Sequence, residues 1–123
     1  MPSYTMKMLS MIFHITSRSH WQTAQSTGFY TADSLATEGF IHCSQVDQVV
    51  WVANQFYRGV PDLVLLAIDP AQLTAELRND VIETGATFPH LYGALNVSAV
   101  VQVFDFPPDA DGSFHLPSAL TNQ

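Results

Sequence analysis

The chain has 123 residues, which is enough for one domain and too short for two. Hydrophobic residues make up 47% of it and charged residues 12%, a balance that argues against an intrinsically disordered protein. Four basic residues against eleven acidic ones give a net charge of −7, and the basic residues are scattered singly. This pattern argues against a protein that binds nucleic acid through a basic surface.

The ends of the chain and its single cysteine bear on location. Residues 1–11 lack the long apolar run of a signal peptide, and no apolar stretch is long enough to span a membrane. Cys43 cannot form an internal disulfide, which favours a reducing compartment. We therefore predict a cytoplasmic protein without membrane contact. It is expected to fold as a single domain over residues 1–123, with a core of about residues 11–106 and loosely packed ends.

The first half of the chain alternates strand patterns with helix patterns. Residues 11–16 have a strand pattern, and a capping box at Ser19 then begins a short helix that Gly28 ends. Residues 40–44 have a second strand pattern, and an amphipathic helix follows over residues 46–57. The apolar face of that helix is predicted to consist of Val46, Val49, Val50, Ala53, Phe56 and Tyr57.

The second half of the chain is dominated by strand patterns. Residues 63–68 are apolar throughout and bounded by prolines, which is typical of a central strand covered on both faces. One helical turn at 69–73, a strand over 76–82, a loop over 83–93 and a last strand over 97–106 are predicted to follow. Strands outnumber helices and do not alternate with them regularly, so the predicted fold class is α+β.

Two histidines occur in similar local patterns. His14 and His42 each lie in a short strand pattern with a hydroxyl two residues later, on Thr16 and Ser44. Alternate side chains of a strand share a face, so each histidine lies beside its hydroxyl. Because buried polar groups need partners, we predict a cleft in which His14 and His42 act as catalytic acid and base while Thr16 and Ser44 bind a ligand. The alternative is that backbone groups satisfy each histidine.

The segment 88–93, FPHLYG, concentrates an aromatic ring, a histidine and a tyrosine. Pro89 makes it rigid, and Gly93 permits a tight turn or a close approach of the backbone. His90 and Tyr92 are therefore predicted to bind a ligand, and the alternative is a packed turn that covers the core.

Three further sequence features concern a possible nucleophile, a possible metal site and a possible partner contact. Strand alternation sends Cys43 to the face opposite His42, which predicts a core cysteine rather than a nucleophile. The histidines match no metal-binding spacing, so no metal is expected. Trp51 falls on the polar side of its helix, where it either packs under a loop or contacts a partner, such as a second copy in a homodimer.

The segments 12–15 (IFHI), 38–44 (EGFIHCS) and 88–93 (FPHLYG) resemble a small bacterial family known as domain of unknown function 952. The resemblance covers about residues 12–104. It implies the fold of the ADP-ribosyltransferases, in which small split sheets and short helices surround an NAD cleft. It also implies a distant similarity to the RNA 2′-phosphotransferases of that superfamily.

The resemblance also implies roles for single residues. His14 resembles the first-strand histidine that contacts the ribose of NAD, and Tyr92 resembles an aromatic residue that stacks on nicotinamide. His42 and Ser44 resemble additional pocket residues of this family. The sequence departs from the superfamily at its late catalytic glutamate, since nothing acidic occurs between Glu83 and Asp105.

Three functional hypotheses remain. The first is a histidine-lined cleft that binds NAD or a related nucleotide, with ADP-ribosyl or phosphoryl transfer as its chemistry. Because no basic residue lies in the three segments, this hypothesis predicts that affinity rises as the histidines protonate between about pH 8 and pH 5. The second is a non-catalytic protein-interaction module on the same fold. The third is an RNA-end phosphotransferase-like enzyme, against which the net charge argues.

Overall fold

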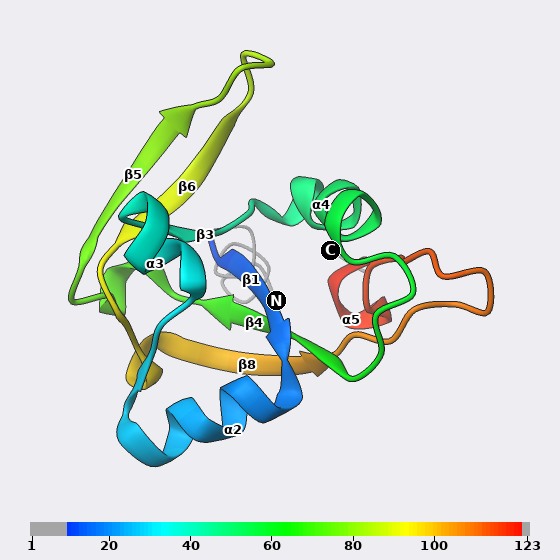
Figure 1. Cartoon of the computed structure of the whole chain (residues 1–123), viewed down its shortest axis with the longest axis horizontal. Coiled ribbons are helices and arrows are strands. Elements are labelled where there is room, and N and C mark those ends of the chain that lie inside the picture. Colours follow the sequence, from blue (N-terminus) through cyan, green and yellow to red (C-terminus); the bar gives the residue numbers. More distant parts are fainter. Residues whose placement is uncertain (1–9, 122–123) are drawn as a thin grey trace.

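The computed structural model describes residues 10–121, which form three small antiparallel sheets joined by short helices (Figure 1). The predicted α+β class is confirmed at this level. The first sheet has the order β1-β4-β8, the second pairs β2 with β7, and the third has the order β3-β6-β5. The strands are β1 (Ile12–Ser17), β2 (Phe29–Tyr30), β3 (Ile41–His42), β4 (Leu63–Ile68), β5 (Glu76–Val81), β6 (Thr87–Tyr92), β7 (Leu95–Asn96) and β8 (Val100–Asp105).

Strand β4 lies at the centre of the first sheet, as its apolar sequence predicts, and all six of its residues are buried. Its alternate side chains enter two separate cores, one on each face of the sheet. Leu63, Leu65 and Ala67 join the first core. Val64, Leu66 and Ile68 join the second core, together with residues from the third sheet.

The helices are short. They are α2 (Arg18–Thr27), α3 (Asp33–Glu38), α4 (Val49–Phe56) and α5 (Ser118–Thr121), with 3₁₀ turns at Val46–Gln48, Pro70–Gln72 and Val97–Ala99. Within residues 10–121, none of them combines the length and apolarity that a crossing of the bilayer requires. Helix α2 ends at Gly28 in a left-handed conformation, with φ of +89°, as predicted. Helix α3 was not predicted.

The segment predicted as a loop over 83–93 is largely a strand. Strand β6 is the middle strand of the third sheet, and together with β5 it forms the long hairpin at the upper left of Figure 1. Pro89 suggested a loop because it cannot donate a hydrogen bond. The carbonyl of Pro89 accepts a hydrogen bond from Cys43 N at 3.0 Å. Cys43 directly follows His42, the last residue of β3, so the pairing of the two strands ends there and requires no N–H from residue 89. The predicted close approach at Gly93 is present, because a Cβ there would lie 2.7 Å from Ala75 Cβ.

The C-terminal segment is packed rather than loosely attached. Phe114 and Leu120 are buried in the first core, and the Phe114 ring lies 5.0 Å from that of Phe106. The Asn54 side chain also accepts from the backbone N–H of Phe114. The prediction of a loose end was wrong here because Pro, Gly and Asp residues between 107 and 113 suggested an open tail. The predicted loose N-terminal end concerns residues outside the described range.

Helix α4 differs from its predicted amphipathic pattern. Val49 and Ala53 are buried as expected, but Phe56 is 71% exposed. A 3₁₀ turn precedes the helix and is capped by the side chains of Gln45 and Gln48. Val46 and Tyr57 also pack against the first core, so the predicted stripe fails near its C-terminal end at Phe56, which lines a surface cleft instead.

These two findings predict effects of very different size for alanine substitutions at two phenylalanines. Phe114→Ala is expected to lower the free energy of unfolding by about 3 kcal/mol, since it leaves a cavity beside Phe106. Phe56→Ala is expected to change it by less than about 0.5 kcal/mol, since the ring is mostly in water. Urea denaturation of both variants and the wild type measures the difference. Equal stabilities for the two variants would contradict the packing of the C-terminal segment.

Candidate functional site

A cleft of about 990 Å³ opens between β1, α3, β3, α4 and the β5–β6 hairpin. Four of the five histidines line it, namely His14, His20, His42 and His90. The fifth, His115, lies in the C-terminal segment and bonds to Asp109. The structure therefore brings to one place imidazoles from three regions of the chain: residues 14–20, residue 42 and residue 90.

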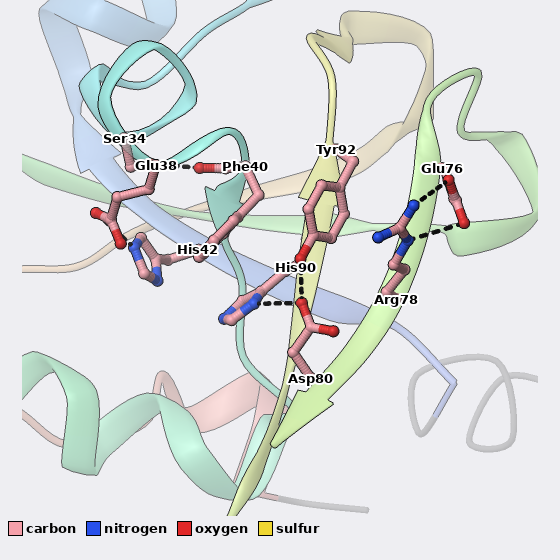
Figure 2. A network of polar contacts seen from close by, with 9 residues as sticks. All are labelled: Ser34, Glu38, Phe40, His42, Glu76, Arg78, Asp80, His90 and Tyr92. Carbon is pink, nitrogen blue, oxygen red and sulfur yellow. Dashed lines mark hydrogen bonds and ion pairs between the residues drawn. The ribbon is translucent and has the colours of Figure 1, made fainter. Parts of the chain in front are cut away.

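Most of the predicted site residues meet in this cleft. Thr16 and Ser44 line it beside the histidines, while Tyr92 does not. Tyr92 lies on the third sheet with its hydroxyl turned to Asp80 (Figure 2). A role for Tyr92 in stacking on a ligand therefore has no support in this arrangement. His20 and Tyr30 line the cleft as well, and the sequence did not indicate them.

His14 is buried and both of its ring nitrogens have protein partners. Its Nδ1 lies 2.6 Å from the backbone carbonyl oxygen of His42, and its Nε2 lies 2.7 Å from the hydroxyl of Tyr30. Since a carbonyl can only accept, Nδ1 carries the proton of the neutral ring. The arrangement therefore gives no support to the acid–base role predicted for His14, because neither nitrogen is free to reach a ligand.

The protonation state of His14 decides where the Tyr30 proton goes. Burial lowers the pKa of His14 to about 4, so the ring is neutral near pH 7 and Nε2 is an acceptor. The Tyr30 hydroxyl then donates to Nε2. When His14 is protonated, Nε2 donates instead, and the Tyr30 hydroxyl donates to Oγ1 of Thr16, 3.0 Å away. The prediction that ligand affinity rises as histidines protonate above pH 5 therefore does not apply to His14.

His42 is the most exposed of the four histidines that line the cleft. Its side chain is 54% exposed, and its Nε2 donates to the Glu38 carboxylate at 3.3 Å. Glu38 ends α3, and the turn at Gly39 and Phe40 returns the chain to β3, which brings the carboxylate back over the imidazole. The sequence contained a signal for this pair, since the two residues are four apart.

His90 is 5% exposed and is held by Asp80 from the neighbouring strand. Its Nδ1 donates to Oδ2 of Asp80 at 2.9 Å, and the Tyr92 hydroxyl donates to the same oxygen (Figure 2). These hydrogen bonds, first that of Tyr92 and then that of His90, hold the pKa of Asp80 below its usual value. On its other side, the His90 ring stacks on Phe40 with centroids 4.0 Å apart.

The charge of the cleft is negative or neutral. Asp33 and Glu38 line it, and no arginine or lysine of the described residues does. The three arginines have partners elsewhere: Arg18 binds Asp62 and Asp105, Arg78 binds Glu76, and Arg58 donates to the carbonyl of Asp111. Lys7 lies outside the described range. The described cleft thus offers carboxylates, imidazoles and hydroxyls, and no cation to a phosphate group.

Aromatic side chains form one end of the cleft. Trp51 and Phe56 come from α4, and Phe88 comes from β6. Their rings lie edge-on or tilted, with centroids 6.3 Å apart for Trp51 and Phe56 and 6.4 Å for Trp51 and Phe88. Trp51 is 50% exposed, so it is not covered by a loop within the described residues. We call these three residues the aromatic rim.

Cys43 is buried, as strand alternation predicts. Burial raises the pKa of its thiol to about 12, so the thiol stays protonated near neutral pH and is no nucleophile. Among residues 10–121, no group of three or more histidine, cysteine, aspartate or glutamate side chains is placed to hold a metal ion.

The pKa of His14 predicts how stability depends on pH. Unfolded His14 binds a proton near pH 6.5, but folded His14 does so only near pH 4. The unfolded state therefore binds more protons between these values, and stability is lost as the pH falls through this window, by about 3 kcal/mol in total. Urea denaturation at pH 7 and pH 4 should show this loss in the wild type and less of it in His14→Gln. Identical losses in both proteins would contradict the burial of His14, and His115→Gln, at an exposed histidine, serves as the control.

Comparisons with known proteins agree with the resemblance seen in the sequence. The family described as protein of unknown function (DUF952) matches residues 15–103. The crystal structure of protein CC0527 from Caulobacter crescentus is 37% identical, covers 90% of this chain and 98% of that chain, and superposes with a TM-score of 0.83. The solution structure of CC0527 is 36% identical, with coverages of 93% and 99% and a TM-score of 0.80. No curated protein matches the chain. The chain therefore belongs to the DUF952 family of proteins of unknown function.

Proposed function

We propose that the cleft binds NAD or a related nucleotide by its nicotinamide-riboside end, the positively charged ring with the attached ribose. The observation that carries this proposal is that hydroxyl and imidazole groups, two carboxylates and an aromatic rim meet in one cleft whose described lining has no arginine or lysine. The hydroxyl and imidazole groups fit the ribose of such a ligand, and the carboxylates and the aromatic rim fit its charged ring.

The polar end of the cleft fits a ribose. Thr16 and Tyr30 contribute hydroxyls that lie 3.0 Å apart, and neutral His14 holds the Tyr30 hydroxyl in place at 2.7 Å. Ser44 adds a third hydroxyl to the cleft from its bridge to Phe13. Hydroxyls both donate and accept, as the two free hydroxyls of a ribose also do. A site that satisfies both roles discriminates strongly against a ligand that lacks a hydroxyl, because a buried partner would then remain unpaired.

The aromatic rim and the carboxylates fit a positively charged ring. Trp51 and Phe88 offer ring faces that attract a cation. Asp33 and Glu38 line the same cleft and favour a cation through Coulomb attraction. The nicotinamide ring of NAD carries one positive charge, and both features therefore favour it over the neutral adenine ring.

The same electrostatics disfavour the pyrophosphate of NAD inside the cleft. A buried phosphate normally needs arginine, lysine or a set of backbone N–H groups, and the described lining supplies no such side chain. The pyrophosphate and the adenosine are therefore placed in solvent, beyond the rim. This charge pattern also gives the RNA-end phosphotransferase the least support of the three hypotheses.

We also infer that the arrangement of split sheets is that of the ADP-ribosyltransferases. Support comes from the position of the cleft between the first and third sheets and from His14 on the first strand. The late catalytic glutamate of that superfamily has no counterpart here. Asn96, in the late part of the chain, instead uses its side-chain amide to bond Thr74 and Ser98. Glu38 enters the cleft from α3 instead, and its carboxylate supplies the negative charge that a developing positive charge on ribose requires.

Isothermal titration calorimetry with three ligands tests the binding proposal. Nicotinamide riboside and NAD are expected to bind, and ADP-ribose, which lacks the charged ring, is expected to bind at least about tenfold more weakly. Glu38→Gln should weaken the binding of nicotinamide riboside, and Glu83→Gln, at an exposed glutamate outside the cleft lining, should leave it unchanged. Tyr30→Phe should cost up to about tenfold through the loss of one hydrogen bond.

Two results would overturn this proposal. No heat with any of the three ligands at millimolar concentration would exclude a nicotinamide-riboside site. Tight binding of ADP-ribose together with no binding of nicotinamide riboside would show that the phosphates are recognised and the ring is not.

A protein-interaction module is the second candidate, because the aromatic rim is exposed. Trp51 is 50% exposed and Phe56 71%, and such aromatic residues are enriched where proteins bind one another. In this alternative the rim contacts a second copy of the chain. It requires no ligand in the cleft.

Analytical ultracentrifugation over a range of concentrations tests the dimer. If the rim is the interface, the wild type is expected to dimerise and Trp51→Ala to remain monomeric. Phe29→Ala is the control, since Phe29 is 53% exposed but lies outside the cleft. A wild type that stays monomeric at all concentrations would exclude the dimer.

A further inference from the structure

We propose that His90 is the proton acceptor of the cleft and that Asp80 and Tyr92 are its positioning residues. The inference rests on the proposed function, because the bound riboside supplies the reacting carbon. It goes beyond that function by assigning a chemical step, the transfer of the ribosyl group to a hydroxyl.

The hydrogen bond to Asp80 determines the tautomer of the neutral His90 ring. Nδ1 of His90 lies 2.9 Å from Oδ2 of Asp80, and a carboxylate oxygen can only accept. Nδ1 therefore carries the proton of the neutral ring. This leaves the lone pair on Nε2, on the side of the ring away from Asp80 (Figure 2).

The other ring nitrogen, Nε2 of His90, is accessible from the cleft. His90 lines the cleft, and no hydrogen bond to its Nε2 is found within residues 10–121. In the same part of the chain, no buried side-chain nitrogen or oxygen lacks a hydrogen-bond partner. Nε2 is therefore reached from the cleft, although the residue as a whole is only 5% exposed.

The neighbouring side chains hold the His90 ring in one orientation. The His90 ring stacks on Phe40 at an interplanar angle of 16°, and the His42 ring meets it nearly at right angles with centroids 5.3 Å apart. The Asp80 carboxylate is itself held, because it also accepts a hydrogen bond from Tyr92. Arg78 in turn lies over the Tyr92 ring, with its guanidinium carbon 4.3 Å from the centroid.

The other histidines of the cleft do not combine these features. His14 uses both nitrogens within the protein, and His42 donates from Nε2 to Glu38 while its side chain is half in water. Within residues 10–121, no carboxylate partner is found for His20, whose ring lies against that of Tyr30. An imidazole that is oriented by a carboxylate and open at its other nitrogen is the arrangement that general bases use.

The proposed step balances as follows. The oxygen of a hydroxyl group, that of water in the simplest case, forms a bond to C1′ of the ribose. The bond between C1′ and the ring nitrogen breaks, and its electron pair stays with the ring, which leaves as neutral nicotinamide. The proton of the attacking hydroxyl passes to Nε2 of His90 and later to solvent. Glu38 stabilises the positive charge that develops on the ribose.

A ¹⁵N NMR experiment on the imidazoles tests the positioning of His90 without any ligand. In the neutral ring of His90, Nδ1 should carry the proton and Nε2 should show the shift of an unprotonated nitrogen. Asp80→Ala should mix the two tautomers, because the acceptor for Nδ1 is lost. Asp109→Ala, which removes the carboxylate partner of exposed His115, should leave the His90 signals unchanged. A protonated Nε2 in the wild type would overturn the inference.

Release of nicotinamide from nicotinamide riboside tests the chemical step. His90→Gln should lower the rate of nicotinamide release by at least about a hundredfold. The Kd for nicotinamide riboside, measured by calorimetry, should change less than about threefold. Asp80→Asn, a milder change in case His90→Gln does not fold, should also lower the rate at nearly unchanged Kd. Binding by the wild type without any release would overturn this inference and leave the proposed function standing. No binding would overturn both.

Discussion

One buried imidazole ties the three sheets together. His14 lies on β1 in the first sheet, its Nε2 bonds to Tyr30 in the second, and its Nδ1 bonds to the carbonyl of His42 in the third. The sheets are small, and two of the three contain strands of only two residues, so few backbone hydrogen bonds of their own hold them in place. A buried polar ring in an otherwise apolar region stabilises only when both nitrogens are paired, and here each pairing fixes the position of another sheet.

The same burial decides the chemistry that remains for the cleft. Because His14 is neutral and both of its nitrogens are used, it contributes shape and a fixed Tyr30 hydroxyl but no charge. The described arginines are bound to carboxylates or a carbonyl elsewhere, so the carboxylates of α3 dominate the field in the cleft. For the proposed nucleotide ligand, this field favours entry by the part that carries no phosphate, so the charge balance of the sequence bears directly on the proposed orientation.

The parts of the fold that sequence patterns predicted are those that local chemistry determines. The apolar run 63–68 must be buried on both faces, and Gly28 ends its helix because it adopts a positive φ. The parts that were missed depend on partners far along the chain. Strand β6 contains Pro89 and is stabilised by β5 and β3 on its two sides, and Tyr92 turns to Asp80 because their strands pair. Likewise, all the predicted site residues except Tyr92 meet in the cleft, but the sequence carried no signal that Asp80 would orient His90.

The two pairs of histidine and carboxylate in the cleft differ mainly in their exposure to water. Glu38 and His42 lie in solvent at 3.3 Å, where their attraction is screened and their geometry is loose. Asp80 and His90 lie 2.9 Å apart against Phe40, and a third group, Tyr92, holds the carboxylate. A base must keep one geometry while a bond forms, whereas a group that stabilises developing charge acts over a longer range. In the proposed reaction, the firmly held pair of His90 and Asp80 therefore suits proton transfer, and the open pair of Glu38 and His42 suits electrostatic stabilisation of the ribose.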